Sequence, residues 1–207
     1  MAELQPPSML AVLVTMIESA PPKPYRLSLE ASLRDGTRIY LRTLRANDKT
    51  QLARGFERLS ARSRRLRFLA PLKRLTTQQL SMLTEVDQVS HVAIGARDTS
   101  RRGRPGVAVA RFIRLAPDPS VAEFAVTVVD EYQHRGLGTL LIRLLLDAAS
   151  KLGLKTLRGY VLPENTAMIR LMDRLGASWT RVWGETLAGD LSVPEPVPSD
   201  KATTPAS

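Results

Sequence analysis

A glycine-containing turn at residues 133–139 is the segment best suited to bind a phosphate group. It follows the apolar segment 121–129 and leads directly into residues with helical spacing, so we expect it to form the first turn of a helix. The first N–H groups of a helix lack partners and lie at the positive end of its dipole, where they can bind a pyrophosphate. Neither Gly136 nor Gly138 has a β-carbon that would block those amides. The predicted contacts are Gln133, His134, Arg135, Gly136, Leu137, Gly138 and Thr139.

Taken alone, this turn fits equally well with an ordinary connection between a strand and a helix. A second helix start at residues 163–168 adds to it. Asn165 is of the type that caps a helix, and Gly176 can end the same helix in the left-handed conformation. One face of this helix is apolar and holds Met168, Leu171, Met172 and Leu175.

Hydrophobic periodicity predicts the elements that position these segments. Residues 27–42 alternate around Asp35-Gly36 and predict a hairpin. Three helices follow, with caps expected at Asp48 and at Thr76 or Thr77. The remaining elements are an antiparallel meander of strands 91–97, 107–115 and 121–129, a helix 136–152, a strand 156–162, the helix that ends at Gly176, and a last strand 178–187. This pattern predicts a mixed α+β fold.

The same pattern predicts one domain between two tails. The domain spans residues 25–188, the N-terminal tail residues 1–24, and a Pro-rich, disordered C-terminal tail residues 189–207. The apolar run 9–17 is too short to cross a bilayer and lacks a positively charged leader. We therefore expect a cytoplasmic protein that does not associate with membranes.

Composition narrows the kinds of site. The chain of 207 residues has no cysteine and two histidines, which excludes thiolate chemistry and argues against a bound metal. Its net charge of +10 favours a polyanionic partner. The basic runs 62–67 and 101–104 are accompanied by no RNA-binding motif, so we expect a solvated face or a docking surface for an acidic protein rather than a nucleic-acid site.

The two glycine and asparagine segments together resemble a known superfamily. The spacing Gln133-x-x-Gly136-x-Gly138, followed by 163–168 and by Arg174-Leu175-Gly176, is similar to the coenzyme A (CoA) signature and second conserved segment of the GNAT N-acyltransferases. A longer likeness, over most of residues 25–177, is to the acetyltransferase domain of bacterial Pat-type protein lysine acetyltransferases. The segments that carry it are 35–37 with 41–42, 56–60 leading into 62–68, 83–87, and 122–126.

This resemblance implies a fold and an activity. The GNAT fold is a mixed, mostly antiparallel twisted sheet flanked by helices in a single domain. The implied reaction moves an acetyl or other acyl group from acetyl-CoA to a primary amine, with a protein lysine as the expected acceptor. The rivals are acylation of a small amine, a catalytically weak acyl-CoA-binding regulatory protein and a nucleic-acid-binding module.

The resemblance also implies roles for individual residues. Glu123 matches the general base, which is needed because a lysine amine with a pKa near 10.4 arrives protonated. Burial among apolar neighbours is expected to raise the pKa of Glu123 toward the working pH, whereas the pattern alone favours a solvent-facing carboxylate. The implied contacts of the pantetheine and acyl arm are Asn165 and the backbone of Ala125, Val126, Thr127 and Val128. Arg174, near the end of the second helix, is a further candidate contact of the cofactor, and an exposed arginine that favours the helix dipole fits this position equally well.

One position departs from the superfamily pattern. Where many members have a tyrosine that protonates the departing thiolate, this chain has Met172, which cannot donate a proton. A thiol with a pKa near 8.5 is already a fair leaving group. Water or Tyr160 therefore remain the candidate proton donors.

Overall fold

The computed structural model describes residues 22–70 and 72–196. They form one mixed sheet of eight strands in the order β1-β2-β3-β4-β5-β6-β8-β7. The strands are β1 (Ser28–Ser32), β2 (Arg38–Thr43), β3 (His91–Asp98), β4 (Gly106–Arg114), β5 (Val121–Val128), β6 (Thr156–Val161), β7 (Ser178–Arg181) and β8 (Leu187–Ser192). Neighbours pair antiparallel except β5 and β6, which pair parallel. The predicted hairpin, the meander and the α+β class are confirmed.

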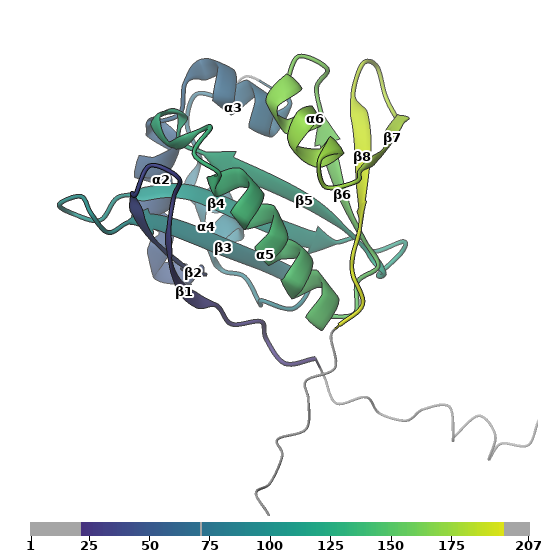
Figure 1. The fold of residues 1–207 in the computed structure, drawn as a ribbon, viewed down its shortest axis with the longest axis horizontal. Coiled ribbons are helices and arrows are strands. Elements are labelled where there is room, and N and C mark those ends of the chain that lie inside the picture. The colour runs from purple at the N-terminus through teal and green to yellow at the C-terminus, as the bar shows by residue number, and fades with distance from the viewer. Residues whose placement is uncertain (1–21, 71, 197–207) are drawn as a thin grey trace, which may run out of the picture.

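Helices cover both faces of this sheet (Figure 1). The long helix α5 (Leu137–Lys151) crosses one face, whereas α2 (Lys49–Glu57) and α4 (Thr77–Thr84) lie on the other. Two shorter helices, α3 (Ala61–Phe68) and α6 (Thr166–Asp173), lie toward one end of the sheet. Within the described ranges no helix is long and apolar enough to cross a bilayer.

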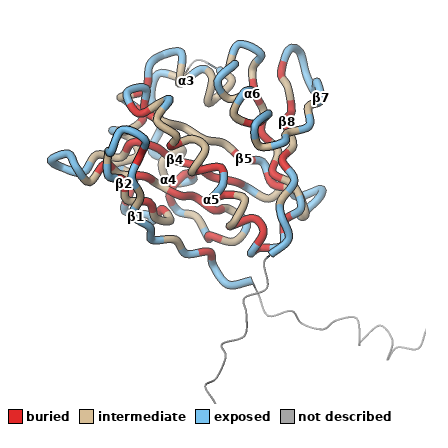
Figure 2. Tube along the Cα trace, viewed as in Figure 1, coloured by how far each residue is buried: buried red, intermediate tan, exposed pale blue. Residues whose placement is uncertain are grey.

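The core lies between α5 and the central strands, where buried residues concentrate (Figure 2). Phe112 of β4 and Phe124 of β5 are register partners and are both buried. On α5, Leu141 and Leu145 are fully buried, as the apolar stripe of that helix predicts. Because side chains alternate along a strand, the residues between them, such as Val109 and Thr127, face α2, α3 and α4 instead.

The cap predicted at Asp48 is wrong. Asp48 ends the 3-10 turn η1 (Ala46–Asp48) with φ −83° and ψ 0°, rather than in the extended conformation of an N-cap, and its side chain makes no capping bond to α2. It accepts from the Arg45 N–H at 2.9 Å, within the capping box of η1. Its buried carboxylate also accepts from Arg42 at 2.6 and 2.8 Å and from Arg97 at 2.8 Å. At Thr76 the predicted cap is confirmed, because its hydroxyl accepts from the Gln79 N–H and the Gln79 side chain accepts from the Thr76 N–H.

The C-terminal end of the domain also differs from expectation. Instead of one strand over 178–187 there is a hairpin of β7 and β8, and β8 continues four residues past the expected boundary at 188. Leu191, assigned to the tail, is fully buried. Gly189, the first residue of the expected tail, lies within β8, and a β-carbon there would lie 2.6 Å from the side chains of Met172 and Trp179. Of the tails predicted at 1–24 and 189–207, residues 1–21 and 197–207 lie outside the described residues.

Candidate active site

The site begins where β5 and β6 separate. The two strands pair only between 121–123 and 156–158, after which β6 pairs with β8 alone. The ladder between β4 and β5 includes bonds from the Val129 N–H to the Val107 carbonyl at 2.9 Å and from the Leu115 N–H to the Val121 carbonyl at 3.0 Å. Because backbone groups alternate along a strand, the N–H and C=O groups of Val126 and Val128 point away from β4 and into the opening.

A groove of about 980 Å³ occupies this opening. Its lining comes from β5, the start of α5, the inner side of α3, β6 and α6. It brings together most of the residues predicted from the sequence, namely Ala125, Val126, Thr127, Val128, Gln133, His134, Gly136, Gly138, Thr139, Asn165 and Arg174. The backbone groups of Ala125 and Thr127 are directed to β4, however, so their contribution to the groove is their side chains.

The turn before α5 has the backbone that its glycines suggest. Gly136 has φ +91°, a conformation that L side chains rarely adopt, and His134 has φ +63°. Gly138 permits a close approach, because a β-carbon there would lie 3.3 Å from the end of the Leu171 side chain of α6, and Leu171 would have to shift by a few tenths of an ångström. The glycines therefore shape the turn and let α5 approach α6, which leaves the first N–H groups of the helix at the end of the groove.

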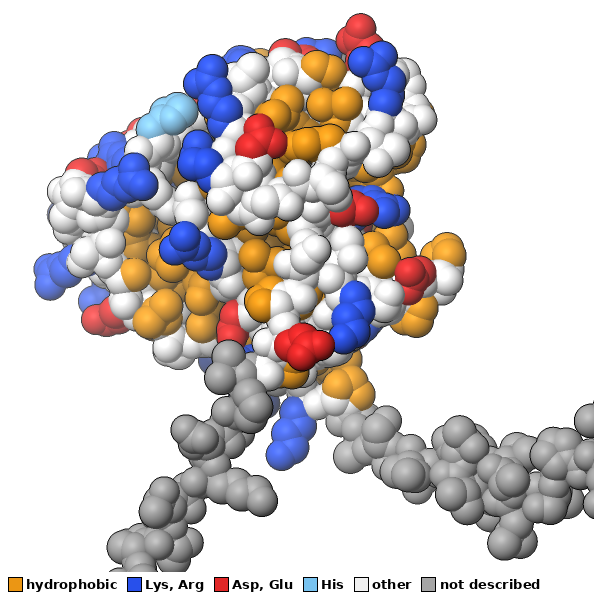
Figure 3. Space-filling model, turned by 45° about the vertical axis from the view of Figure 1, so that its right-hand side comes forward, with side chains coloured by type: hydrophobic (Ala, Val, Ile, Leu, Met, Phe, Trp, Pro, Cys, Tyr) orange, Lys and Arg blue, Asp and Glu red, His pale blue; other side chains and the backbone are white. Residues whose placement is uncertain are grey.

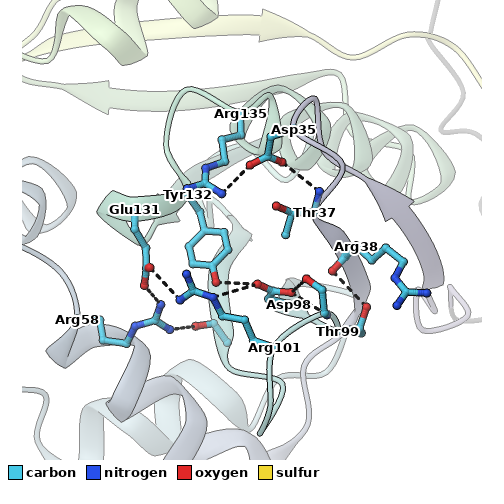
Figure 4. Close-up of polar contacts among 12 residues, drawn as sticks. Asp35, Thr37, Arg38, Arg58, Asp98, Thr99, Arg101, Glu131, Tyr132 and Arg135 are labelled. Atoms are coloured by element: carbon cyan, nitrogen blue, oxygen red, sulfur yellow. Dashed lines mark hydrogen bonds and ion pairs between the residues drawn. The ribbon is translucent and has the colours of Figure 1, made fainter.

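Three residues of this turn do not present side chains to the groove as free donors. Leu137 is buried in the core. Arg135 forms an ion pair of 2.7 Å with Asp35 in the β1–β2 turn, and its guanidinium lies 5.1 Å from the ring of Tyr132 (Figure 4). Gln133 lines the groove, but its amide nitrogen donates to the Val128 carbonyl at 3.1 Å and to Ser63 at 3.3 Å.

Side chains of neighbouring segments hold this turn in place. Tyr132, in the 3-10 turn η2 (Asp130–Tyr132), is buried and donates to the Asp98 carboxylate at 2.8 Å. Glu131 accepts from Arg58 and from Arg101, the latter at 2.9 Å (Figure 4). Part of the basic run 101–104 therefore anchors this turn, which the sequence interpretation missed.

Helix α3 spans the groove between its two walls. At one wall, Asp130 accepts from the Ser60 N–H and from the hydroxyls of Ser60 and Ser63 at 2.7–3.0 Å. At the other wall, Glu164 receives hydrogen bonds from Arg62 and Arg65. The inner side of α3 lines the groove with Arg62, Ser63, Leu66 and Arg67. The sequence interpretation of the run 62–67, as a solvated face or a docking surface, did not include this lining, and the helical spacing of these four residues was the available signal.

Glu123 lies at the point where the groove opens. In the strand register Glu123 lies opposite Arg158 of β6, at the last position where β5 and β6 pair. The next residues, Phe124 and Ala125, line the groove. The expected burial of Glu123 is wrong, because its side chain is exposed. Ile113, its register partner on β4, is 43% exposed, so no helix covers this part of the sheet.

The second helix contributes a cap and a buried wall. Asn165 accepts a hydrogen bond from the Met168 N–H at 3.3 Å and also lines the groove, so its capping role is confirmed. Met172 is fully buried, as expected for the apolar face. Tyr160 lines the groove, and its ring centre lies 4.7 Å from that of Trp183 in the β7–β8 turn.

The sequence of this domain matches a known protein family. The family model described as the acetyltransferase (GNAT) domain matches residues 38–178. The chain belongs to the GNAT acetyltransferase family. Members of this family are acyl-CoA-dependent N-acetyltransferases, and the groove between β5 and β6 is the part of this GNAT domain that can hold an extended ligand.

Two Pat proteins are among the relatives of this GNAT domain. Acetyltransferase Pat of Mycolicibacterium smegmatis is 34% identical over 153 residues, which cover 74% of this chain but 45% of that protein. The chain thus spans less than half the length of this relative. The solved GNAT domain of S. lividans PAT is 26% identical with a TM-score of 0.73, covering 80% of this chain and 96% of that domain.

A more distant structure shares only the fold. The spermidine N-acetyltransferase of Vibrio cholerae, solved with CoA and spermine, is 17% identical with a TM-score of 0.58 and covers 75% of this chain and 95% of its own.

Proposed function

We propose that this GNAT domain transfers an acetyl or other acyl group from acyl-CoA to a primary amine, and that the amine is a lysine side chain of a protein. The observation that carries the proposal is the groove, which joins a free strand edge to the first turn of a helix. One end of such a groove suits a peptide-like chain, and the other suits a phosphate.

The residues present fit CoA. The outward N–H and C=O groups of Val126 and the N–H of Val128 match the amide groups of the pantetheine arm, as an added strand would, whereas the Val128 carbonyl already accepts from Gln133. The pyrophosphate would lie at the amides of residues 134–139, where the dipole of α5 favours negative charge. Basic side chains line the same groove and can neutralise phosphate charge, and these are Arg34, Arg62, Arg143 and Arg174.

Glu123 is the proposed general base. When bound, acyl-CoA supplies an activated thioester. Glu123 accepts a proton from the incoming ammonium, directly or through one water, and the neutral nitrogen then attacks the thioester carbonyl as the C–N bond forms and the C–S bond breaks. The nitrogen loses its second proton to water as the amide forms. Its exposed position at the mouth of the groove suits a base that must meet a substrate arriving from solvent.

The departing thiolate must take up a proton. Met172 is buried and cannot supply it. Tyr160 has its side chain at the groove, and it is our candidate for the proton donor beside water.

The choice of a protein lysine rests on the likeness to the Pat proteins, since the chain is 34% identical to the M. smegmatis protein. The likeness to a spermidine acetyltransferase is one of fold, and it keeps small amines as the alternative acceptors.

The test is thiol release from acetyl-CoA by the purified chain, measured with lysine-bearing proteins, with small amines and with no acceptor. Release that depends on a protein acceptor, with acetyl-lysine found by mass spectrometry, would support the proposal. Release only with small amines would replace the acceptor. Failure of acetyl-CoA to bind in calorimetry would overturn the proposal altogether.

A further inference from the structure

Two arginine side chains border one cavity beneath α3, beside the middle of β5. Arg111 of β4 is 4% exposed and is the register partner of Ala125, which lines the groove. Arg67 of α3 lines the groove and also borders a smaller cavity beneath it, which Arg111 borders too. The two guanidinium groups are close enough that Arg67 lowers the pKa of Arg111, in addition to the larger effect of burial.

Neither arginine has a carboxylate partner among the residues that the structure describes. Both hydrogen bonds of Arg111 come from Nη1, to the Leu83 carbonyl at 3.0 Å and to Nε2 of His91 at 3.1 Å. Its Nε and Nη2 atoms make none, although the side chain borders the cavity. Arg67 makes no hydrogen bond or ion pair within residues 22–70 and 72–196, and its guanidinium lies 4.9 Å from the ring of Phe68.

The other two arginines of the same cavity have a carboxylate partner. Arg42 and Arg97 also border it, and both pair with the buried carboxylate of Asp48. A buried charge is costly unless it is paired and hydrogen-bonded, and Asp48 meets that need for these two. Burial lowers the pKa of Arg67, with Glu123 as the opposing influence, and the exposed Glu123 forms no ion pair with it.

The cavity itself suits a short chain with a charged end. Its volume is about 80 Å³, enough for several water-sized groups, since one needs roughly 15 Å³. Apolar side chains make most of its wall, including Phe56, Leu59 and Leu83. Arg67 and Thr127 border both the cavity and the groove, so the cavity lies next to the strand edge that is proposed to hold the acyl arm.

We propose that Arg67 and Arg111 bind a carboxylate carried by one of the two substrates, an inference that rests on the proposed acyl transfer. An arginine fork binds a carboxylate through paired hydrogen bonds and supplies the charge that is missing here. The carboxylate can come from the donor, as in a dicarboxylic acyl group such as succinyl, or from the acceptor, as in an amino acid. In either case, the substrate completes the site.

The experiment compares matched substrate pairs with the purified chain. For the donor, succinyl-CoA is compared with the uncharged butyryl-CoA, using one neutral amine. For the acceptor, an amino acid is compared with its amide, using acetyl-CoA. We expect kcat/KM to favour the carboxylate in one pair by at least tenfold, about 1.4 kcal/mol, and the pair that shows the preference identifies the source.

Variants then connect that preference to the two arginines. Arg67→Met should remove most of it, and Arg67→Lys should retain part, because a lysine keeps the charge but loses the fork. Arg54→Met is the matched control, since Arg54 is exposed on α2 and borders neither the groove nor the cavity. Because Arg111→Met can fail to fold, it is used only if its thermal unfolding resembles that of the parent chain.

The outcomes separate the two proposals. Acyl transfer that shows no preference for a carboxylate in either pair, or a preference that Arg67→Met leaves intact, would overturn the carboxylate site while the acyltransferase stands. A chain that binds no acyl-CoA would overturn both.

Discussion

At the scale of single residues, the role proposed for Glu123 as general base rests on its position rather than on burial. An exposed carboxylate at the mouth of the groove can receive a proton from an arriving ammonium and pass it to solvent. Arg67 lines the groove from α3, and the charge of Glu123 opposes the lowering of its pKa by burial. The chemistry proposed for this enzyme therefore takes place at the boundary between a covered and an uncovered part of the sheet.

We predict that Glu123→Gln keeps CoA affinity but lowers turnover at least tenfold, about 1.4 kcal/mol in the barrier. The amide has nearly the same shape but accepts no proton at neutral pH, so the rise of turnover with pH that reports the base should disappear as well. Steady-state kinetics and calorimetry measure the two effects. Glu30→Gln, at an exposed carboxylate of β1, is the matched control. Equal turnover in both variants would remove Glu123 as the base.

The two histidines give a second prediction at this scale. Burial, with Arg111 as the second cause, lowers the pKa of His91 to about 4 from the ordinary 6.5. The unfolded chain therefore binds more protons at this residue between pH 6.5 and pH 4, so the free energy of unfolding should fall as the pH drops through that window. Above pH 6.5 the residue should have no effect on the pH dependence.

Urea unfolding at pH 7, 5.5 and 4.5 measures this dependence. His91→Gln should weaken the fall in stability, because glutamine does not titrate, whereas His134→Gln, at the exposed histidine of the turn before α5, should not. Parallel curves for the parent chain and His91→Gln would contradict the assignment.

At the scale of elements, α3 is the part that assembles the groove. Its N-terminal end is tied to Asp130 after β5 through Ser60 and Ser63, and its middle to Glu164 before α6 through Arg65. Burial alone would raise the pKa of Asp130, but bonds from the Ser60 N–H and from the Ser60 and Ser63 hydroxyls hold it below its ordinary value. The helix therefore depends on a charged group in another segment for its orientation.

Asp130→Ala should release the N-terminal end of α3 and weaken CoA binding several-fold. A hydrogen bond to a charged group contributes about 1.5–3 kcal/mol to stability, and Asp130→Ala removes three such bonds. Amide hydrogen exchange of residues 60–68 and calorimetry with CoA measure the result. Asp118→Ala is a matched control, because Asp118 accepts from the Ser120 N–H and hydroxyl in the β4–β5 loop. Unchanged exchange in α3 would show that its position does not depend on Asp130.

Local periodicity was enough for the elements but not for their long-range contacts. The alternation of 27–42 and the apolar stripe of 137–151 depend on neighbours in sequence, so both were predicted correctly. Asp48, Arg135 and Arg101 are held by partners 6 to 100 positions away, which no local pattern records. Glu123 was misjudged for the same reason, because its exposure depends on which helices cover β4 and β5.

The groove shows the same division. Its glycines and Asn165 were predicted because a turn and a helix cap are local. The contributions of α3, of the cavity and of Arg111 were missed, because they arise only when β4 and α3 are brought together. The helical spacing of Arg62, Ser63, Leu66 and Arg67 was visible in the sequence. Because two of these residues are arginines, however, we predicted a solvent-exposed face.

At the scale of the molecule, the fold continues further toward the C-terminus than the sequence suggested. A chain that ends at Ala188 would lose Leu191 from the core and the bidentate pair between Arg158 and Asp190 at 2.6 and 2.8 Å. We expect a loss of at least about 3 kcal/mol of unfolding free energy, since removing one buried leucine side chain alone costs about 2–5 kcal/mol. Denaturant unfolding measures it. A chain that ends at Pro196 keeps all of β8 and is the control, and similar midpoints for the two would contradict the prediction.

Charge at this scale is mixed rather than segregated on the face that Figure 3 shows, where acidic side chains lie among the basic ones. Several arginines that contribute to the net charge of +10 are committed to internal pairs, among them Arg42, Arg97, Arg135 and Arg158. The basic composition therefore reports in part on how the loops are anchored.

The parallel pairing of β5 and β6 has one more consequence. Every other pairing in the sheet is antiparallel, so this three-residue contact joins two parts, β1–β5 and β6–β8, that are each continuous ladders. A ligand that forms hydrogen bonds along the free edge of β5 while touching α6 takes the place of a strand between the two parts. Without a ligand, the protein should be most flexible where β5 and β6 separate. A bound ligand should reduce the motion of the two parts relative to one another, so that the substrate contributes to the stability of the sheet while it is bound.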